Sequence, residues 1–256
     1  MQKWDSKQYL KFQAERTQPA ADLAARLTAA EPARIVDIGC GPGNSTAVLR
    51  QKYPYAQIIG ADSSPDMLKT AAKEHSGIDF RLCNVPQELP SLGQNFDIVF
   101  SNACIQWIPD KAGLLKAMLR MLRPGGMLAV QVPVNQTEPI YKIIFAIAES
   151  EKWKQKFAQP RIFHTLSAEK YFDVLAENAS DFTMWQTTYF HRMHSYNEII
   201  EWYRGTGLRP YLSVLNAAEK AELESEVLAG VKKAYPMQKN GEIIFRFPRL
   251  FFTAVK

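Results

Sequence analysis

The sequence predicts a doubly wound α/β fold built on a mostly parallel sheet, and three observations lead to this prediction. Short apolar, β-branched segments alternate with amphipathic segments over the first half of the 256-residue chain. A glycine-rich turn, Gly39-Cys40-Gly41-Pro42-Gly43, joins the first such strand to the helix that follows it. An acidic residue, Asp62, ends the second strand about twenty residues later. In parallel sheets ligands bind at the carboxyl ends of strands, so these features predict a binding site there.

The glycine turn is the best-defined candidate site in the chain. Glycine reaches backbone angles that are closed to other residues, and its missing side chain lets a ligand lie against the main chain. The N–H groups that begin the next helix then face that ligand. The dinucleotide fingerprint Gly-x-Gly-x-x-Gly has its third glycine inside the helix, where this chain has Asn44. The spacing therefore favours the nucleoside-binding loop of S-adenosylmethionine (SAM) enzymes over a pyrophosphate cradle.

The other elements follow from periodicity. Strands are expected at 57–62, 79–85, 95–102 and 127–132, then at 182–190 and, as a strand pair or a bent strand interrupted by Pro248, at 242–255. Helices are expected in the first thirty residues and at 45–52, 111–122, 138–150, 151–157, 168–178, 196–205 and 217–234.

These elements predict a seven-stranded, Rossmann-like sheet with helical lid insertions before and after the sixth strand. The predicted SAM-binding core is 1–134, with an N-terminal helical flap. The lid insertions are 135–181 and 195–241, and the ranges 182–194 and 242–256 supply the last strands of the sheet.

Composition narrows the function classes. The net charge is +5 without any Lys/Arg block, which suits a small anionic substrate and gives no support for nucleic-acid binding. The polar start of the chain lacks a signal core, and no apolar run approaches the ~20 residues of a membrane span. We expect a cytoplasmic protein with no membrane partner, as a monomer or weak dimer. Cys40, Cys83 and Cys104 form no C-x-x-C pair and are expected to be small buried residues.

Several polar residues are candidates for the cofactor site. Asp62 is placed to accept both hydroxyls of a ribose, because Ser64 followed by Pro65 already caps the next helix. Asn84 ends the third strand, where a side-chain amide can meet an adenine amino group. Arg16 shares a helix face with Tyr9, which fits either a solvated arginine on a covering helix or a flap that closes over the cofactor.

The second half of the chain offers cations and hydrogen-bond donors. Arg209 lies in a Gly/Pro-bounded loop and Arg249 follows a proline in an apolar strand, so each needs an anionic partner. That partner is either a structural carboxylate or a substrate carboxylate bound in a bidentate manner. Tyr189 and His191 alternate on the sixth strand and should share a face, for packing or for substrate contact.

Other kinds of chemistry lack their signatures. His191 and His194 have no third residue at a metal-ligand spacing, so no metal is expected. The sequence holds no Gly-x-Ser-x-Gly elbow and no P-loop lysine, so we expect no nucleophilic catalytic residue.

The first 135 positions resemble class I SAM-dependent methyltransferases. The stretch 36–44 is similar to motif I of that family, Asp62 matches its ribose-binding acid, and 122–126 matches the turn before the fifth strand. Blocks along nearly the whole chain resemble a family within this class whose members methylate a carboxylate of trans-aconitate. These blocks are 4–19, 42–46, 62–65, 101–103 with 106–107, 187–189 with 191, 206–210, 238 with 240–241, and 247–251. Asn84 departs from the pattern, because related enzymes often carry an acid there.

This resemblance implies transfer of a methyl group from SAM to a carboxylate, giving a monomethyl ester and S-adenosylhomocysteine. A carboxylate is ionised at neutral pH, so the reaction needs in-line placement and no general base. The implied cofactor-binding residues are Tyr9, Arg16, Asp37, Gly39, Gly41, Asn44, Asp62, Ser63, Met67, Asn84, Val85 and Asn102. The implied substrate-binding residues are Gln106, Trp107, Tyr189, His191, Arg209 and Arg249, with Gln106 and Trp107 at the transfer point.

Two alternative functions are compatible with the same SAM-binding first half of the chain. One is a methyltransferase for a phenol, quinone or other lipid-like acceptor, which predicts an apolar lid pocket without two arginines. The other is a SAM-binding module without catalysis, which needs no acceptor site. An NAD-dependent oxidoreductase is disfavoured by the glycine spacing.

Overall fold

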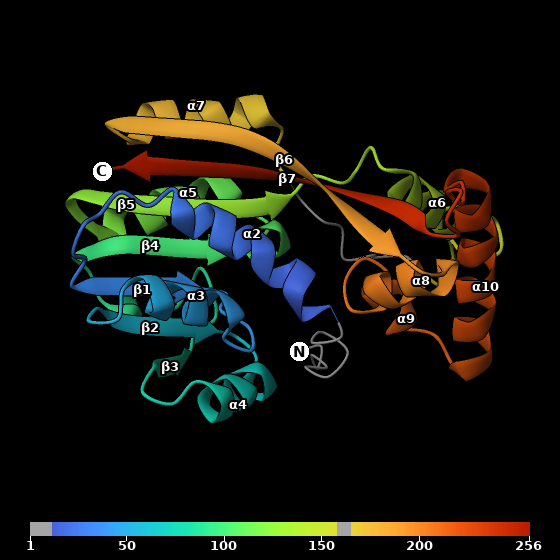
Figure 1. The fold of residues 1–256 in the computed structure, drawn as a ribbon, viewed down its shortest axis with the longest axis horizontal. Helices are drawn as coiled ribbons and strands as arrows, with labels where there is room; N and C mark the ends of the chain where they lie inside the picture. The colour runs from blue at the N-terminus through green and yellow to red at the C-terminus, as the bar shows by residue number, and fades with distance from the viewer. Residues whose placement is uncertain (1–11, 158–164) are drawn as a thin grey trace.

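A seven-stranded sheet in the order β3-β2-β1-β4-β5-β7-β6 forms the centre of the computed structural model, which describes residues 12–157 and 165–256 (Figure 1). The first five strands run parallel, and β7 is antiparallel to both β5 and β6. The strands are β1 Arg34–Ile38, β2 Gln57–Asp62, β3 Asp79–Leu82, β4 Phe96–Asn102, β5 Leu122–Pro133, β6 Asp181–Met193 and β7 Ile243–Val255. This is the sheet that the alternation of segments predicts.

Helices cover both faces of the sheet. They are α2 Gln13–Ala25, α3 Asn44–Lys52, α4 Pro65–Glu74, α5 Lys111–Met121, α6 Pro139–Ala148, α7 Ala168–Asn178, α8 Tyr196–Arg204, α9 Arg209–Leu212 and α10 Ala217–Ala234, with short 3-10 turns at Leu89–Leu92 and Ile105–Trp107. Neighbouring strand residues point to opposite faces, so Ile35 packs beneath α2 and α3, whereas Val36 packs with α5 and α7.

The helix α7 is an exception to the predicted lid, because it packs on the sheet. Its range falls inside the predicted insertion 135–181, yet Tyr171 and Leu175 are buried in the core beneath it. The centres of the Tyr171 ring and of the Phe252 ring on β7 lie 5.4 Å apart, and this contact joins α7 to the sheet.

 

The remaining helices of the second half form a separate layer, which we call the helical arm. It consists of α6, α8, α9 and α10, packed on the ends of β6 and β7 that continue past β5 (Figure 1). The predicted helix at 151–157 is instead a series of turns, in which Trp153 and Phe157 are both buried in a small cluster with Leu223 of α10.

Pro248 does not interrupt β7, contrary to the sequence expectation of a strand pair or a bend there. The strand is continuous from Ile243 to Val255 and pairs along its whole length with β6. The carbonyl of Pro248 accepts from the Val134 N–H, so the proline nitrogen faces the side where β5 ends. A proline there removes at most the last bond of the β5 ladder.

No helix among the described residues is long and apolar enough to span a membrane.

Candidate active site

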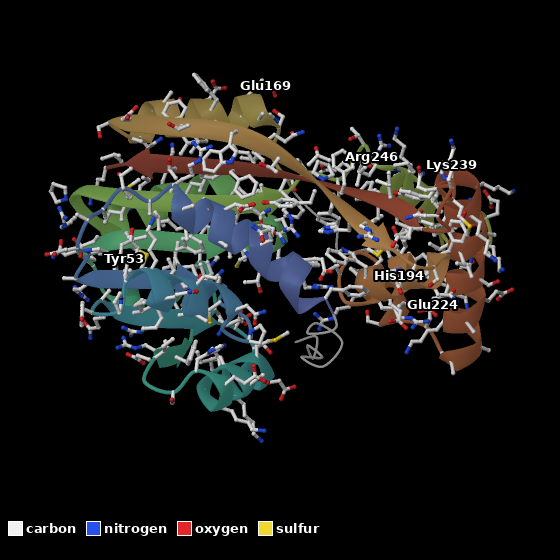
Figure 2. All side chains as sticks on the ribbon, in the orientation of Figure 1. Tyr53, Glu169, His194, Glu224, Lys239 and Arg246 are labelled. Atoms are coloured by element: carbon white, nitrogen blue, oxygen red, sulfur yellow. The ribbon has the colours of Figure 1, made fainter. Side chains whose placement is uncertain are left out.

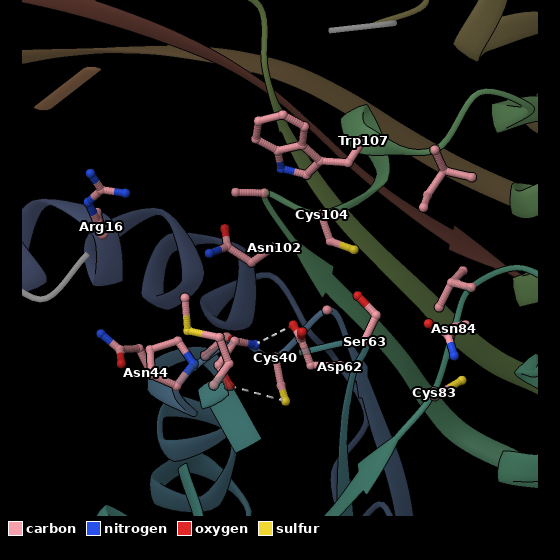
Figure 3. A pocket seen from close by; sticks show the side chains of 18 residues that line it. Arg16, Cys40, Asn44, Asp62, Ser63, Cys83, Asn84, Asn102, Cys104 and Trp107 are labelled. Carbon is pink, nitrogen blue, oxygen red and sulfur yellow. Dashed lines mark hydrogen bonds between the residues drawn. The ribbon is translucent and has the colours of Figure 1, made fainter. Parts of the chain in front are cut away.

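A cavity of about 230 Å³ opens at the carboxyl ends of β1, β2 and β4 (Figure 3). It is lined by the glycine turn, the ends of β2 and β4, the segment after β3, and Arg16 of α2. The lining residues are Arg16, Gly39, Cys40, Gly41, Pro42, Asn44, Ser45, Asp62, Ser63, Met67, Cys83, Asn84, Val85, Asn102, Ala103, Cys104, Trp107 and Ile108. The topology therefore brings most of the predicted cofactor-binding residues to one place.

Two glycines of the turn are required by both conformation and close packing. Gly39 has a φ of +76°, and a Cβ there would lie 2.2 Å from the Sγ of Cys104. Gly43 has a φ of +95°, and its Cβ would lie 2.5 Å from a ring carbon of His75. Gly41 has no such neighbour and faces the cavity. The turn thus brings its main chain against the space that a ligand would fill.

Asp62 is the acid that lines the cavity. Its Oδ2 accepts from the Gly41 N–H at 2.9 Å, and its Oδ1 accepts from the Ser64 N–H at 2.8 Å. Ser64 caps α4 through its own hydroxyl, which accepts from the Met67 N–H, as the sequence predicts. Burial raises the pKa of Asp62, while the backbone donors oppose that rise. Each oxygen keeps a lone pair for a ligand hydroxyl.

Asp37 has a different place from the one predicted, because it does not line the cavity. It is fully buried behind the turn, where its Oδ2 accepts from the hydroxyls of Ser45 at 2.6 Å and Thr46 at 2.7 Å. Burial raises the pKa of Asp37 to about 6, although the two hydroxyls oppose this rise. Asp37 therefore fixes the start of α3 and so supports the turn from beneath.

The other predicted cofactor residues differ in their hydrogen bonding. Asn84 donates its amide to Glu88 at 3.2 Å, which leaves its carbonyl oxygen to accept. The Oδ1 atoms of Asn44 and Asn102 are buried, and no described residue donates to them. Ser63, Met67 and Val85 contribute to the lining. Tyr9 lies outside the described residues.

A second, smaller cavity of about 60 Å³ adjoins the first. Arg16, Ala103 and Trp107 line both cavities, so the two meet at these residues. The second cavity lies between the end of β5, the arm and β7. Its lining is Arg16, Ala103, Gln106, Trp107, Pro133, Asn135, Trp202, Tyr203, Thr206, Gly207, Phe247 and Arg249.

Arg249 brings a buried cation to this second cavity. Its position on β7 is opposite Pro133, where β5 ends, and the residue is only 5% exposed. The guanidinium donates to the Gln131 side-chain oxygen at 3.0 Å and lies 4.7 Å from the centre of the Phe247 ring. A neutral amide and an aromatic face are thus among the groups that position the guanidinium.

Tyr189 and Arg209 are two predicted substrate residues that the structure places outside the lining of both cavities. The Tyr189 hydroxyl donates to Asp22, so it joins β6 to α2. Arg209 is half-buried in the first turn of α9.

His191 also lies outside both linings, behind Trp202, at 4.8 Å between ring centres. Burial, together with the charges of Arg249 and Arg16, lowers the pKa of His191 to about 4. The imidazole is therefore neutral at physiological pH. His194 is exposed on the arm (Figure 2) and lies 3.5 Å from a Glu242 carboxylate oxygen. The described residues contain no group of three or more potential metal ligands.

Of the predicted substrate residues, the structure brings Gln106, Trp107 and Arg249 together in the second cavity. Sequence reasoning missed Asn135, Trp202, Tyr203 and Phe247 as lining residues. The aromatic residues of α8 have the periodicity of an ordinary core helix, so local pattern gives no sign that one edge of that core is open. Thr206 and Gly207 did stand out as part of a glycine loop.

Comparison with known proteins agrees with this geometry. A family described as a methyltransferase domain matches residues 30–198. The chain is 42% identical to trans-aconitate 2-methyltransferase of Azoarcus sp. (strain BH72), over all of both chains. It is 43% identical to the protein of that name from Methylobacterium nodulans, over 99% of this chain and 98% of the relative.

Solved structures share the fold at lower identity. The YcgJ protein of Bacillus subtilis matches with a TM-score of 0.61 at 16% identity, over 93% of this chain and 98% of the other. Haemonchus contortus phosphoethanolamine N-methyltransferase 2 in complex with S-adenosyl-L-methionine matches with a TM-score of 0.53 at 19% identity, over 93% and 52%.

Proposed function

The chain belongs to the trans-aconitate 2-methyltransferase family, and on this premise we propose that it esterifies one carboxylate of trans-aconitate or a similar small polycarboxylic acid. SAM is the cofactor, and when bound it supplies an electrophilic methyl group on a sulfonium ion. The products are the monomethyl ester and S-adenosylhomocysteine. A methyl group is the only atom group that changes place, and the carboxylate oxygen supplies the electron pair for the new bond.

The observation that carries this proposal is the pair of adjoining cavities. The larger has the features of a nucleoside site, and the smaller is lined by Arg249 and Arg16. Because both are lined by Arg16, Ala103 and Trp107, a donor in one and an acceptor in the other would meet there. Holding two reactants in line is worth a large part of the barrier for such a transfer.

The first cavity fits the cofactor in its donors and acceptors. We infer that Asp62 accepts the ribose hydroxyls and that the Asn84 carbonyl oxygen accepts the adenine amino group. The main chain at Gly39 and Gly41 would lie against the cofactor, and Asn102 would offer its Oδ1, to which no described residue donates. Ser63, Met67 and Val85 would complete this site.

The chemistry of the acceptor explains why no general base is required. A carboxylate is already ionised near pH 7, so no proton has to leave during the transfer. Arg249 supplies positive charge where the remaining carboxylates would bind. Gln106 and Trp107 would line the transfer point and exclude water from it. His191 lines neither cavity, and its lowered pKa of about 4 makes it a weak base.

Mass spectrometry of the products tests the proposal. The protein is incubated with SAM and a panel of small polycarboxylic acids, with phenols and quinones in parallel. We expect a methyl ester of a tricarboxylic acid. Methylation of phenols alone would favour the alternative acceptor class, and tight binding of S-adenosylhomocysteine without turnover on any compound would favour a binding module.

We further propose that the enzyme acts in the cytoplasm as a monomer or weak dimer, without nucleic acid. Its three cysteines are free thiols, which suits a reducing compartment. The positive net charge of +5 suits a small anionic acceptor, and the sequence has no Lys/Arg block that would favour nucleic acid. Sedimentation of the protein at micromolar concentration would test the oligomeric state.

A further inference from the structure

We propose that Tyr203 binds a non-reacting carboxylate of the acceptor jointly with Arg249, and that Asn135 orients its hydroxyl for this purpose. The proposal rests on the proposed function, because it names how the same acceptor site holds its ligand. Tyr203 was not among the residues that the sequence pointed to. The three residues come from separate parts of the chain, namely the segment after β5, the helix α8 and the strand β7.

The first step of the argument is the hydrogen bonding of the hydroxyl. Asn135 Nδ2 donates to Tyr203 Oη at 2.8 Å, and both side chains are buried. The phenol therefore acts as the acceptor in this bond and keeps its own hydrogen for another partner. No acceptor for that hydrogen is present among the residues that the structure describes. Burial raises the pKa of Tyr203 strongly, so the group remains a neutral donor.

The second step is the position of the hydroxyl relative to charge. Tyr203 and Arg249 both line the second cavity, and the positive charge of Arg249 acts on the Tyr203 hydroxyl. A carboxylate has two oxygens, so it can accept from a guanidinium and a phenol together. Burial of such an anion requires donors of this kind on every side, because unpaired charge is costly in an apolar setting.

The third step separates this carboxylate from the one that reacts. Arg16, Ala103 and Trp107 line both cavities and mark the transfer point, whereas Tyr203, Asn135 and Arg249 line only the second cavity. A carboxylate bound between Tyr203 and Arg249 therefore lies away from the cofactor. The site thus selects acceptors that carry at least one carboxylate in addition to the one that is methylated.

The variant Tyr203→Phe tests the proposal with trans-aconitate as acceptor. Removing a hydrogen bond to a charged group should raise KM for the acceptor about tenfold or more. We expect kcat to change little and the Kd for S-adenosylhomocysteine to stay the same, because the cofactor cavity is not lined by Tyr203. An unchanged acceptor KM in folded Tyr203→Phe would overturn the proposal.

The matched control is Tyr235→Phe. Tyr235 packs in the same aromatic cluster and contacts the same ring, Phe245, as Tyr203 does. Its hydroxyl also accepts one hydrogen bond, from the Ile140 N–H at 3.2 Å, but it lines neither cavity. We expect Tyr235→Phe to keep the wild-type acceptor KM. An equal rise in KM in both variants would assign the effect to packing and overturn the proposal.

A double-mutant cycle tests joint binding of one carboxylate. In an Arg249→Gln background, Tyr203→Phe should raise the acceptor KM by a smaller factor than in the wild type, since the shared ligand group is already weakly held. Independent, multiplicative effects would contradict the proposal. Asn135→Ala gives a second route to the same site and should also raise the acceptor KM.

Failure of the proposed function would look different. In that case the wild-type protein would form no methyl ester of any polycarboxylic acid. Failure of the present proposal would leave the wild-type reaction intact and the acceptor KM insensitive to Tyr203→Phe.

Discussion

At the scale of single residues, two acids near the glycine turn have separate tasks. Asp62 faces the first cavity and holds the turn through the Gly41 N–H, whereas Asp37 lies behind the turn and holds the hydroxyls of α3. The position at a strand end predicts a cofactor role for Asp62, and the family resemblance implies one for Asp37. An acid at the end of a parallel strand reaches the ligand edge, but an acid inside the strand pairs with whatever the next helix places above it.

The pH dependence of stability should report on Asp37. Its pKa is about 6 in the folded protein and 3.8 as the ordinary value, so the folded state holds the proton to higher pH. Its contribution to stability is therefore present below pH 3.8 and is lost as the pH rises through about 6. We expect Asp37→Asn to abolish this loss, which amounts to at most about 3 kcal/mol.

Urea unfolding of both proteins across this pH range measures the effect. The exposed Asp173→Asn serves as the control and should keep the wild-type profile. Parallel profiles of wild type and Asp37→Asn would show that burial of Asp37 has no such effect.

The affinity for the cofactor should depend on Asp62. Asp62→Asn keeps the shape of the side chain but removes the charge from an acceptor of ribose hydroxyls. We expect the Kd for S-adenosylhomocysteine to rise roughly tenfold or more, since hydrogen bonds to charged groups are worth about 1.5–3 kcal/mol. Isothermal titration calorimetry measures this, with exposed Asp66→Asn as control. Equal affinities of the two variants would argue against the ribose role.

At the scale of elements, the sequence predicts the five parallel strands and their helices well, because the patterns that indicate these elements are local. The turn after β1 and the Ser64 cap of α4 each depend on neighbouring residues, whereas 122–126, expected as a turn before the fifth strand, is already part of β5. The second half depends on distant contacts. Periodicity predicts the helix at 168–178 correctly, but its place on the sheet depends on distant contacts such as that of Tyr171 with β7.

The alternation of Tyr189 and His191 was also read correctly as a shared face, since their rings stack at 6.2 Å. What the local pattern does not contain is the partner of that face. In the structure α2 and α8 cover this face. Asp22 of α2 accepts a hydrogen bond from the Tyr189 hydroxyl, and the Trp202 ring of α8 packs on His191.

The two predicted carboxylate-binding arginines should now differ in effect. Arg249 lines the second cavity from β7, and Arg209 of α9 does not. We expect Arg249→Gln to raise the acceptor KM tenfold or more, by roughly the energy of a charged hydrogen bond, and Arg209→Gln to leave it unchanged. Steady-state kinetics with trans-aconitate measures both. A larger effect at Arg209 would place the acceptor in another part of the arm.

At the scale of the whole molecule, catalysis is expected to rest on placement between two units, the sheet edge and the arm. Neither unit forms both cavities alone. The first cavity is built mainly by the sheet edge, and the second needs residues of α8, β7 and the segment after β5. This joint construction is why sequence motifs identified the cofactor more readily than the acceptor.

A reaction without a general base should show little pH dependence near neutrality. Between pH 6.5 and 8.5, approximately, the acceptor carboxylates stay ionised and His191 stays neutral, so kcat should vary by less than about twofold. A pH–rate profile at saturating SAM measures this. A steep rise with an apparent pKa of about 7 would indicate a proton-transfer step and contradict the mechanism.

The β6–β7 ribbon has a consequence for how acceptor choice can change in this fold. Its register in the sheet is fixed by the pairing of Met127 with Val255 through Pro133 with Arg249. The stretch between the two strands, 194–242, leaves β6 after Met193 and enters β7 at Ile243, at the end of the ribbon away from this pairing with β5. We expect insertions or exchanges within that stretch to reshape the acceptor cavity while the donor cavity keeps its geometry, so that new substrates can evolve without rebuilding the site that binds SAM.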